Sequence, residues 1–180
     1  YIPLIWDLSF VEIFSADDRG FDIVIGNPPY VRQEDIAAPQ VNGQKVTDDK
    51  AQYKEKLIKT VYEAYPEYFR YQKVDNHVAI KLNKQSDLYI YFYFLGMSLL
   101  NDKGSFCFIT SNSWLDVGYG ADLQAFLLRQ GHVKLILDNQ AKRSFKDADV
   151  NTIIALLGKP GKPLNCGLSN TARFVMFKTP

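Results

Sequence analysis

A short apolar run that ends at a rigid turn constrains the fold of this chain more than any other feature. The run is Phe21-Asp-Ile-Val-Ile25, and Gly26-Asn27-Pro28-Pro29 follows it directly. Continuous rather than alternating hydrophobicity is expected of parallel strands that are covered on both faces. We therefore expect a buried strand that stops at a sharp loop.

Two helices are expected after this loop. Apolar residues at helical spacing predict an amphipathic helix over Tyr53–Tyr65 that ends before Pro66. Either Ser86 or Asp87 can cap the second helix, over Leu88–Leu100. The rest of residues 31–85 is polar and charged and is interpreted as an excursion from the main fold.

The second half of the chain adds strands and one more helix. Strands are expected over Ser105–Thr110, His132–Asp138, Val150–Leu157 and Ala172–Phe177, with a helix over 120–130. Strand, helix, strand, helix, strand and then two successive strands describe an α/β sheet. We expect it to be mostly parallel with an antiparallel end.

The composition limits the size of the fold and its partners. A chain of 180 residues with 47% hydrophobic and 23% charged residues suits one ordinary globular domain. The net charge is only +1, so composition gives no support for binding nucleic acid through a basic face. The chain begins at Tyr1, already inside an apolar stretch, and we expect its start to be cut within a larger domain.

Cysteine content and hydropathy indicate a protein of the cytoplasm. The two Cys do not make a disulfide framework, and together with the two His they show no metal-ligand spacing. No metal site is therefore expected. The longest apolar run, Leu88–Leu100, is shorter than the roughly 20 residues that a membrane span needs, and no membrane partner is expected.

The tetrapeptide Asn27-Pro28-Pro29-Tyr30 is the best candidate for chemistry, because ligands of open α/β sheets bind at the carboxyl ends of strands. The Asn27 amide oxygen can accept a hydrogen bond from an amino group, and Pro28 offers only a carbonyl acceptor. The Tyr30 ring can stack on a planar substrate. Two acceptors on an aromatic amine favour a pyramidal nitrogen whose lone pair can point at an electrophile. Taken alone, the four residues fit a plain rigid turn about equally well.

The segment Phe21–Glu34 resembles the catalytic-motif segment of amino-group DNA methyltransferases, and it is most similar to the gamma-class adenine-N6 enzymes of bifunctional restriction–modification proteins. The similarity continues at Ser86–Phe92, Lys103-Gly104, Thr110–Leu115 and from Ser144-Phe145 to Leu156. It covers the chain from about Phe21 to the end and is weakest over residues 31–85.

The resemblance implies methyl transfer from S-adenosylmethionine to the N6 atom of an adenine that has been flipped out of double-stranded DNA. In this interpretation Asn27 and the Pro28 carbonyl hold the amino group, with Pro29 stiffening the loop, and Tyr30 and Phe145 enclose the base. Extruding a base costs a few kcal/mol, and stacking on an aromatic ring returns about 1–3 kcal/mol per base.

Further site residues follow from the same resemblance. Lys142, Arg143 and Lys146 surround Phe145 and could meet DNA phosphates, although a solvated loop also explains them. Phe92 lies where the family often places an aromatic side chain near the cofactor, with a plain core role as the alternative. Asp7 is a weak match to the family's acidic cofactor-binding residue, and a helix cap or surface carboxylate explains it as well.

The resemblance also implies a fold and a domain organisation. We expect a Rossmann-like S-adenosylmethionine-dependent methyltransferase fold whose N-terminal strands, with the main cofactor-binding motif, are missing. Residues 1–180 would form a partial catalytic domain, with an insertion over 31–85 and no complete second domain. Gly118-Tyr119-Gly120 is not followed by the rest of a dinucleotide-binding pattern. Target-recognition and nuclease domains are the expected partners within the parent protein.

Two alternatives stay open at the level of sequence. The same tetrapeptide also serves methyltransferases that modify a glutamine side-chain amide (N5) of a protein, although the 31–85 excursion and the Phe145 segment are untypical of them. The isolated chain could also be a non-catalytic DNA-binding or assembly module, because half of the expected cofactor pocket is absent from it.

Overall fold

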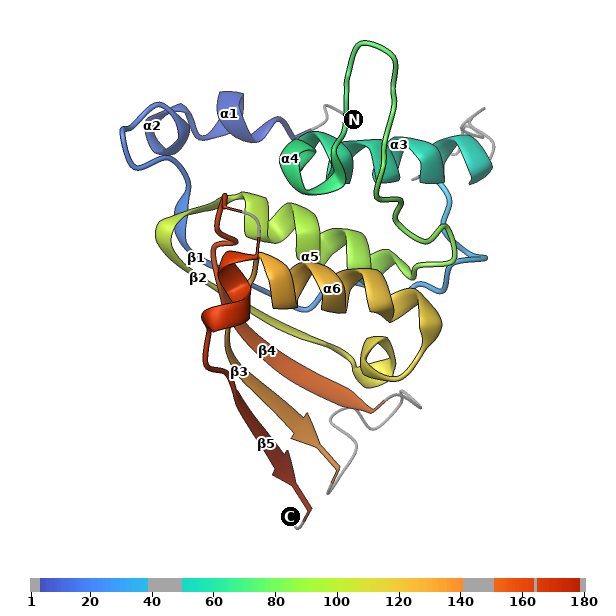
Figure 1. The fold of residues 1–180 in the computed structure, drawn as a ribbon, viewed down its shortest axis with the longest axis vertical. Coiled ribbons are helices and arrows are strands. Elements are labelled where there is room, and N and C mark those ends of the chain that lie inside the picture. Colours follow the sequence, from blue (N-terminus) through green and yellow to red (C-terminus); the bar gives the residue numbers. More distant parts are fainter. Residues whose placement is uncertain (1–3, 39–49, 141–150, 164, 179–180) are drawn as a thin grey trace.

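A five-stranded sheet organises the chain (Figure 1). The computed structural model describes residues 4–38, 50–140, 151–163 and 165–178. The strands lie in the order β1-β2-β4-β3-β5 across the sheet. In chain order they are β1 (Phe21–Gly26), β2 (Leu100–Ser111), β3 (His132–Asn139), β4 (Thr152–Gly158) and β5 (Arg173–Phe177).

Only β4 runs against the other four strands. β1 is parallel to β2 and β3 is parallel to β5, whereas β4 is antiparallel to both β2 and β3. The predicted α/β sheet, mostly parallel, is therefore confirmed. The reversed strand lies inside the sheet, between β2 and β3, which agrees with the nearly complete burial of Ile153, Ala155 and Leu157.

Helix α5 (Leu88–Ser98) forms the centre of the core. Its buried residues point in several directions and include Tyr89, Ile90, Tyr93, Phe94 and Met97. Towards the sheet, the ring centroid of Tyr93 lies 5.5 Å from that of Phe106 on β2. Towards the outer helices, the ring centroid of Phe94 lies 4.8 Å from that of Phe126 on α6 (Ala121–Arg129). A helix that is apolar on all sides must be covered on all sides, so α5 lies between the sheet and an outer helical layer.

The described part of the segment expected as an excursion, from residue 50 onward, is packed into the same core. Helix α3 (Lys50–Ala64) forms as predicted and ends before Pro66, which begins the short helix α4 (Pro66–Phe69). Both contribute buried side chains, including Ile58, Val61 and Phe69. Neither α3 nor any other helix in the described ranges is long and apolar enough to cross a membrane.

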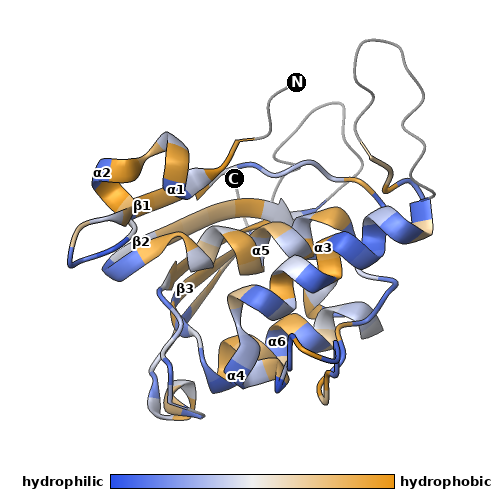
Figure 2. Cartoon of the chain, turned by 90° about the horizontal axis from the view of Figure 1, so that it is seen from above, coloured by the Kyte–Doolittle hydropathy of each residue, from blue (hydrophilic) through white to orange (hydrophobic). Residues whose placement is uncertain are grey.

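Two short helices lie on the opposite side of the sheet from α5 (Figure 2). They are α1 (Trp6–Ser9) and α2 (Val11–Phe14). The rings of Trp6, Phe10 and Phe14 each lie 5.4–5.9 Å, between centroids, from the ring of Phe21 at the start of β1. This aromatic cluster covers only the first residue of β1 on that face.

The rest of this face is apolar and open among the described residues. Ile23 and Ile25 of β1 are 68% and 75% exposed, and neighbouring strands continue the row with half-buried Cys107 and Leu156. Directly paired residues of adjacent strands share one face of a sheet. β1 was expected to be covered on both faces, and within the described residues the helical layer covers only one. The edge of β1 away from β2 also carries no strand there.

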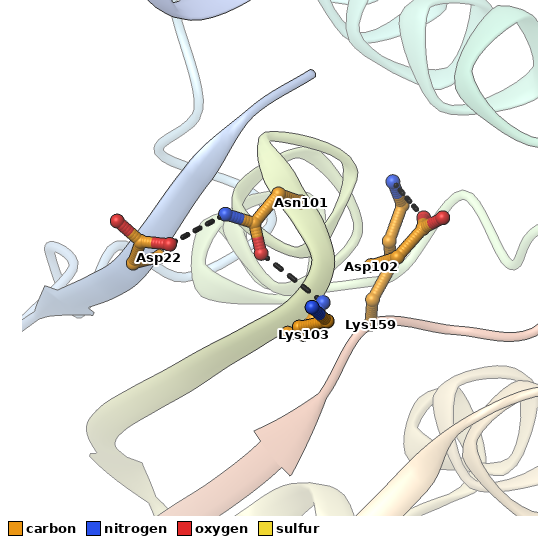
Figure 3. Close-up of polar contacts among 5 residues, drawn as sticks. All are labelled: Asp22, Asn101, Asp102, Lys103 and Lys159. Carbon is orange, nitrogen blue, oxygen red and sulfur yellow. Dashed lines mark hydrogen bonds and ion pairs between the residues drawn. The ribbon is translucent and has the colours of Figure 1, made fainter. Parts of the chain in front are cut away.

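Strand β2 begins five residues earlier than expected, at Leu100 rather than Ser105. The reason is a polar tie between the first residues of β1 and β2 (Figure 3). The buried Asn101 side chain donates from Nδ2 to Asp22 Oδ1 at 2.6 Å and accepts at Oδ1 from the Lys103 backbone N–H at 3.1 Å. Next to it, Lys159 donates to Asp102 at 2.8 Å, which joins the start of β2 to the residue after β4.

Replacing Asn101 by leucine should destabilise the protein by about 1–3 kcal/mol, because the buried Asn101 side chain makes one hydrogen bond to the charged Asp22 carboxylate and one with the Lys103 N–H, and both are lost. Urea unfolding measures the change. Exposed Asn151 provides the matched control, and Asn151→Leu should stay within about 0.5 kcal/mol of wild type. Equal free energies of unfolding of the two variants would show that the hydrogen bonds of Asn101 do not stabilise the protein.

Candidate active site

Asn27-Pro28-Pro29-Tyr30 leaves the sheet at the carboxyl end of β1, as the sequence predicts. Asn27 and Pro29 are exposed, Pro28 is buried and Tyr30 is half-buried. The preceding Gly26 pairs with Phe108 of β2, and a Cβ at Gly26 would lie 3.0 Å from Phe108 Cε1. Glycine therefore lets the start of the loop lie close against the Phe108 ring.

The Tyr30 side chain is anchored on the neighbouring strand. Its hydroxyl donates to the Ile109 carbonyl of β2 at 3.2 Å. Burial raises the pKa of the Tyr30 hydroxyl above its ordinary value, so the phenol stays protonated and remains a donor. The hydrogen bond thus fixes the ring in the loop that also carries the exposed Asn27.

The main chain after Tyr30 is held against the start of α5. The Leu88 N–H donates to the Val31 carbonyl at 3.0 Å, and the Gln33 N–H donates to Asp87 Oδ1 at 2.9 Å. Asp87 occupies the N-cap position of α5, but its carboxylate makes no bond to an N–H of that helix. The expected capping role of Asp87 is therefore replaced by a contact with the loop, which sequence reasoning missed.

Helix α3 holds the same loop from the other side. Lys54 Nζ donates to the Gln33 side-chain oxygen at 2.9 Å and to its carbonyl at 3.2 Å, and Lys50 Nζ donates to the Glu34 carbonyl at 2.9 Å. Desolvation lowers the pKa of Lys54, against the opposing influence of Glu34 and Asp87. Backbone acceptors such as these leave no signal in a sequence, so neither lysine could be singled out from it.

The connection that carries Phe145, Lys142, Arg143 and Lys146 lies outside the described residues. Its two flanks are described: β3 ends at Asn139 and β4 begins at Thr152. Thr152 pairs with Ser111, the last residue of β2, and the Asn112 N–H donates to the Asn151 carbonyl at 2.9 Å. The connection therefore leaves and re-enters the sheet at the same end of the strands as Asn27, which follows the carboxyl end of β1.

The two residues expected near the cofactor are separated in the structure. Phe92 is 40% exposed although its neighbours on α5 are buried. Asp7 is exposed in the first turn of α1 and lines a cavity of about 520 Å³ together with Leu99 and Leu100. That cavity lies where β2 begins, at the opposite end of the strands from Asn27. Cofactor contact by either residue stays a prediction.

Comparison with known proteins supplies the family of the chain. Residues 3–145 match the family model of the Eco57I restriction-modification methylase. The chain belongs to this methylase family. The match includes the Asn27–Tyr30 loop, α5 and the end of β2, which together form the described part of the site.

Curated relatives agree with the Eco57I methylase family. The type II methyltransferase M.XhoI of Xanthomonas vasicola is 31% identical over 124 residues, or 67% of this chain. M.PaeR7I of Pseudomonas aeruginosa is 28% identical over 118 residues, or 66% of this chain. The aligned regions span only 17% and 15% of these relatives, so the chain corresponds to less than a fifth of their length.

Solved structures show the fold that this methylase chain shares. A protein from Listeria monocytogenes assigned to the class I S-adenosylmethionine-dependent methyltransferases matches 89% of this chain, and 38% of its own, at 14% identity and a TM-score of 0.53. The ATP-dependent type ISP restriction-modification enzyme LlaBIII, bound to DNA, matches 88% of this chain and 10% of its own at 19% identity and a TM-score of 0.51. The fold is that of the class I methyltransferases.

Tyr30→Phe should lower the free energy of unfolding by about 1 kcal/mol, because the hydrogen bond to the Ile109 carbonyl is lost while the ring remains. Thermal unfolding measures the loss. Tyr91→Phe is the matched control, because the buried Tyr91 hydroxyl has no hydrogen-bond partner among the described residues and its removal should cost nothing. An unchanged melting temperature in Tyr30→Phe would contradict the anchoring of this ring on β2.

Proposed function

We propose that the protein containing this chain methylates the N6 amino group of an adenine extruded from double-stranded DNA, with S-adenosylmethionine as methyl donor, within a restriction–modification protein. One observation carries the proposal: in a member of the Eco57I methylase family, Asn27 is exposed at the carboxyl end of β1, and Tyr30, three residues later in the same loop, is bonded to β2. Such a protein acts where the DNA is, in the cytoplasm.

The chemistry of this chain lies in two acceptors and one ring. The Asn27 side-chain oxygen and the Pro28 carbonyl accept the two hydrogens of the adenine amino group. They favour a pyramidal nitrogen and stabilise the positive charge that develops on it during transfer. Neutral Asn27 takes no proton, and the proton leaves after the new N–C bond has formed. The cofactor, when bound, supplies the methyl group.

The remaining residues bind the base and the DNA. Tyr30 stacks on one face of the adenine and Phe145 on the other, and Lys142, Arg143 and Lys146 contact phosphates. The position of the connection that carries Phe145 supports this arrangement. Its flanks, Asn139 and Thr152, lie at the same end of the strands as Asn27. Two stacked rings offset much of the few kcal/mol that base extrusion requires.

Phe92 is the described residue that fits contact with the cofactor, because it is a large aromatic side chain left 40% exposed on a buried helix. Asp7 is left out of the proposed pocket because it lies at the far end of the strands. The main cofactor-binding motif belongs to another part of the protein.

The chain is one part of a larger methyltransferase domain in this proposal. Among the described residues no strand pairs with the outer edge of β1, and Ile23 and Ile25 are exposed. Both observations support the proposal, because an apolar sheet face of this kind is stable when covered. Further strands and helices of the protein cover this face, and separate domains supply target recognition and DNA cleavage. Residues 31–85 are an insertion, and its described parts, 31–38 and 50–85, contribute to the core.

Asn27→Ala in the complete protein should abolish methylation of DNA while leaving stability within about 0.5 kcal/mol, because Asn27 is exposed. Incorporation of labelled methyl groups from S-adenosylmethionine into plasmid DNA from a methylation-free strain measures this. The control is Gln52→Ala, an exposed amide on α3, which should retain full activity. Near-normal methyl transfer by Asn27→Ala would contradict the proposed role of Asn27. Labelling of protein rather than DNA would favour methylation of a glutamine side chain in a protein.

Ile25→Glu tests whether the open face of β1 is covered in the complete protein. A carboxylate buried there without a partner should lower stability by about 2–3 kcal/mol. Val74 is fully exposed on a turn, so Val74→Glu should change stability by no more than about 0.5 kcal/mol. Chemical denaturation compares the two variants, and equal stabilities would show that the face is free in solution.

A further inference from the structure

We propose that Asp87 is a positioning residue for the Asn27–Tyr30 loop, with Tyr119 orienting its carboxylate; the inference rests on the proposed function of that loop. Both carboxylate oxygens are bonded by groups from other parts of the chain. Asp87 Oδ1 accepts from the Gln33 N–H at 2.9 Å, and Oδ2 accepts from the Tyr119 hydroxyl at 2.7 Å. The residue thus joins the catalytic loop, the start of α5 and the 3-10 helix η2 (Gly118–Gly120).

The hydrogen-bond chain that orients Asp87 has a defined direction. The Tyr119 hydroxyl donates to Asp87, so in its 3.0 Å contact with the Tyr89 hydroxyl Tyr119 must accept and Tyr89 must donate. Burial raises the pKa of Tyr119 to about 12 and also raises that of Tyr89, so both phenols stay protonated at any working pH. The carboxylate is therefore held by a donor that does not titrate.

The position of Asp87 suits a charged acceptor. It precedes the first residue of α5, an eleven-residue helix, and the positive end of the helix dipole favours a carboxylate there. Hydrogen bonds to an ionised acceptor are about twice as strong as neutral ones. The bond to the Gln33 N–H is therefore a strong point of attachment for the loop.

Two hydrogen bonds lay the loop along the first turn of α5, one from Asp87 and one from the Leu88 N–H to the Val31 carbonyl. Lys54 binds Gln33 from the opposite side, so this residue is clamped between α5 and α3. Only two residues separate Gln33 from Tyr30, and two prolines stiffen the loop before that. The hold on Gln33 therefore restricts the short segment that leads from the Tyr30 ring and the acceptors into the rest of the chain.

The test compares three replacements in the complete protein. Asp87→Leu removes both acceptors at similar size. Asp87→Asn retains an oxygen for the Gln33 N–H and presents its amide to the Tyr119 hydroxyl, which can accept. Tyr119→Phe removes only the orienting hydroxyl. The matched control is Tyr91→Phe, which removes a buried hydroxyl of α5 that has no partner within the described parts of the chain.

Methylation of plasmid DNA should separate these variants by kcat rather than by KM. Asp87→Leu should lower kcat about 10- to 100-fold with KM for DNA and S-adenosylmethionine within about threefold, because misplaced groups affect the transition state most. Tyr119→Phe should lower kcat by a smaller factor, roughly threefold to tenfold. Asp87→Asn and Tyr91→Phe should both remain within about threefold of wild type.

Hydrogen exchange gives a readout that does not depend on activity. In Asp87→Leu the amides of residues 31–36 should exchange at least about tenfold faster while those of α5 stay protected, and Asp87→Asn should show a smaller increase, because its neutral oxygen still accepts from the Gln33 N–H. Wild-type kcat in Asp87→Leu, or a loss in Asp87→Asn as large as that in Asp87→Leu, would overturn the positioning role. A wild-type protein that does not methylate DNA would overturn the proposed function instead, and the exchange comparison would still decide the role of Asp87.

Discussion

The structure depends on the burial of α5 between the sheet and an outer layer of helices. Its aromatic residues leave no polar face for water, so the sheet must cover one side and α3, α4 and α6 must cover the other. The start of this helix then has a fixed place beside the carboxyl ends of β1 and β2. The hydrophobic packing of one helix thereby places Asp87 and Leu88 against the loop that follows Asn27.

In the candidate site, a loop that is held by hydrogen bonds carries the exposed side chain of Asn27. Tyr30 is tied to β2, and the residues after it are tied to α5 and α3, whereas Asn27 itself is exposed. Preorganised acceptors are effective because they need no rearrangement when charge develops. Membership of the Eco57I methylase family and the class I methyltransferase fold agree with a loop held in this way.

Sequence patterns predicted the helices and strands well where residues close together in the chain set the structure. The β-branched run before Asn27 forms a strand, Pro66 ends α3, and the five strands appear in the expected chain order. The predictions were less accurate where the structure depends on a hydrogen bond to a residue far away in the chain. β2 starts at Leu100 because Asn101 binds Asp22, which lies 79 residues away. The Asp87 carboxylate bonds Gln33 rather than its own helix, because the loop brings a donor within reach.

The sequence by itself determined the chemistry that this chain can offer: two acceptors and a ring after a strand, at the end where α/β sheets bind ligands. This follows because a motif of four consecutive residues carries its own geometry. Only the tertiary structure decided that β4 lies between β2 and β3, that residues 50–85 belong to the core, and that Asp87, Lys54 and Tyr119 converge on one loop. Those outcomes depend on backbone groups and on contacts between segments far apart in the chain, which no local pattern records.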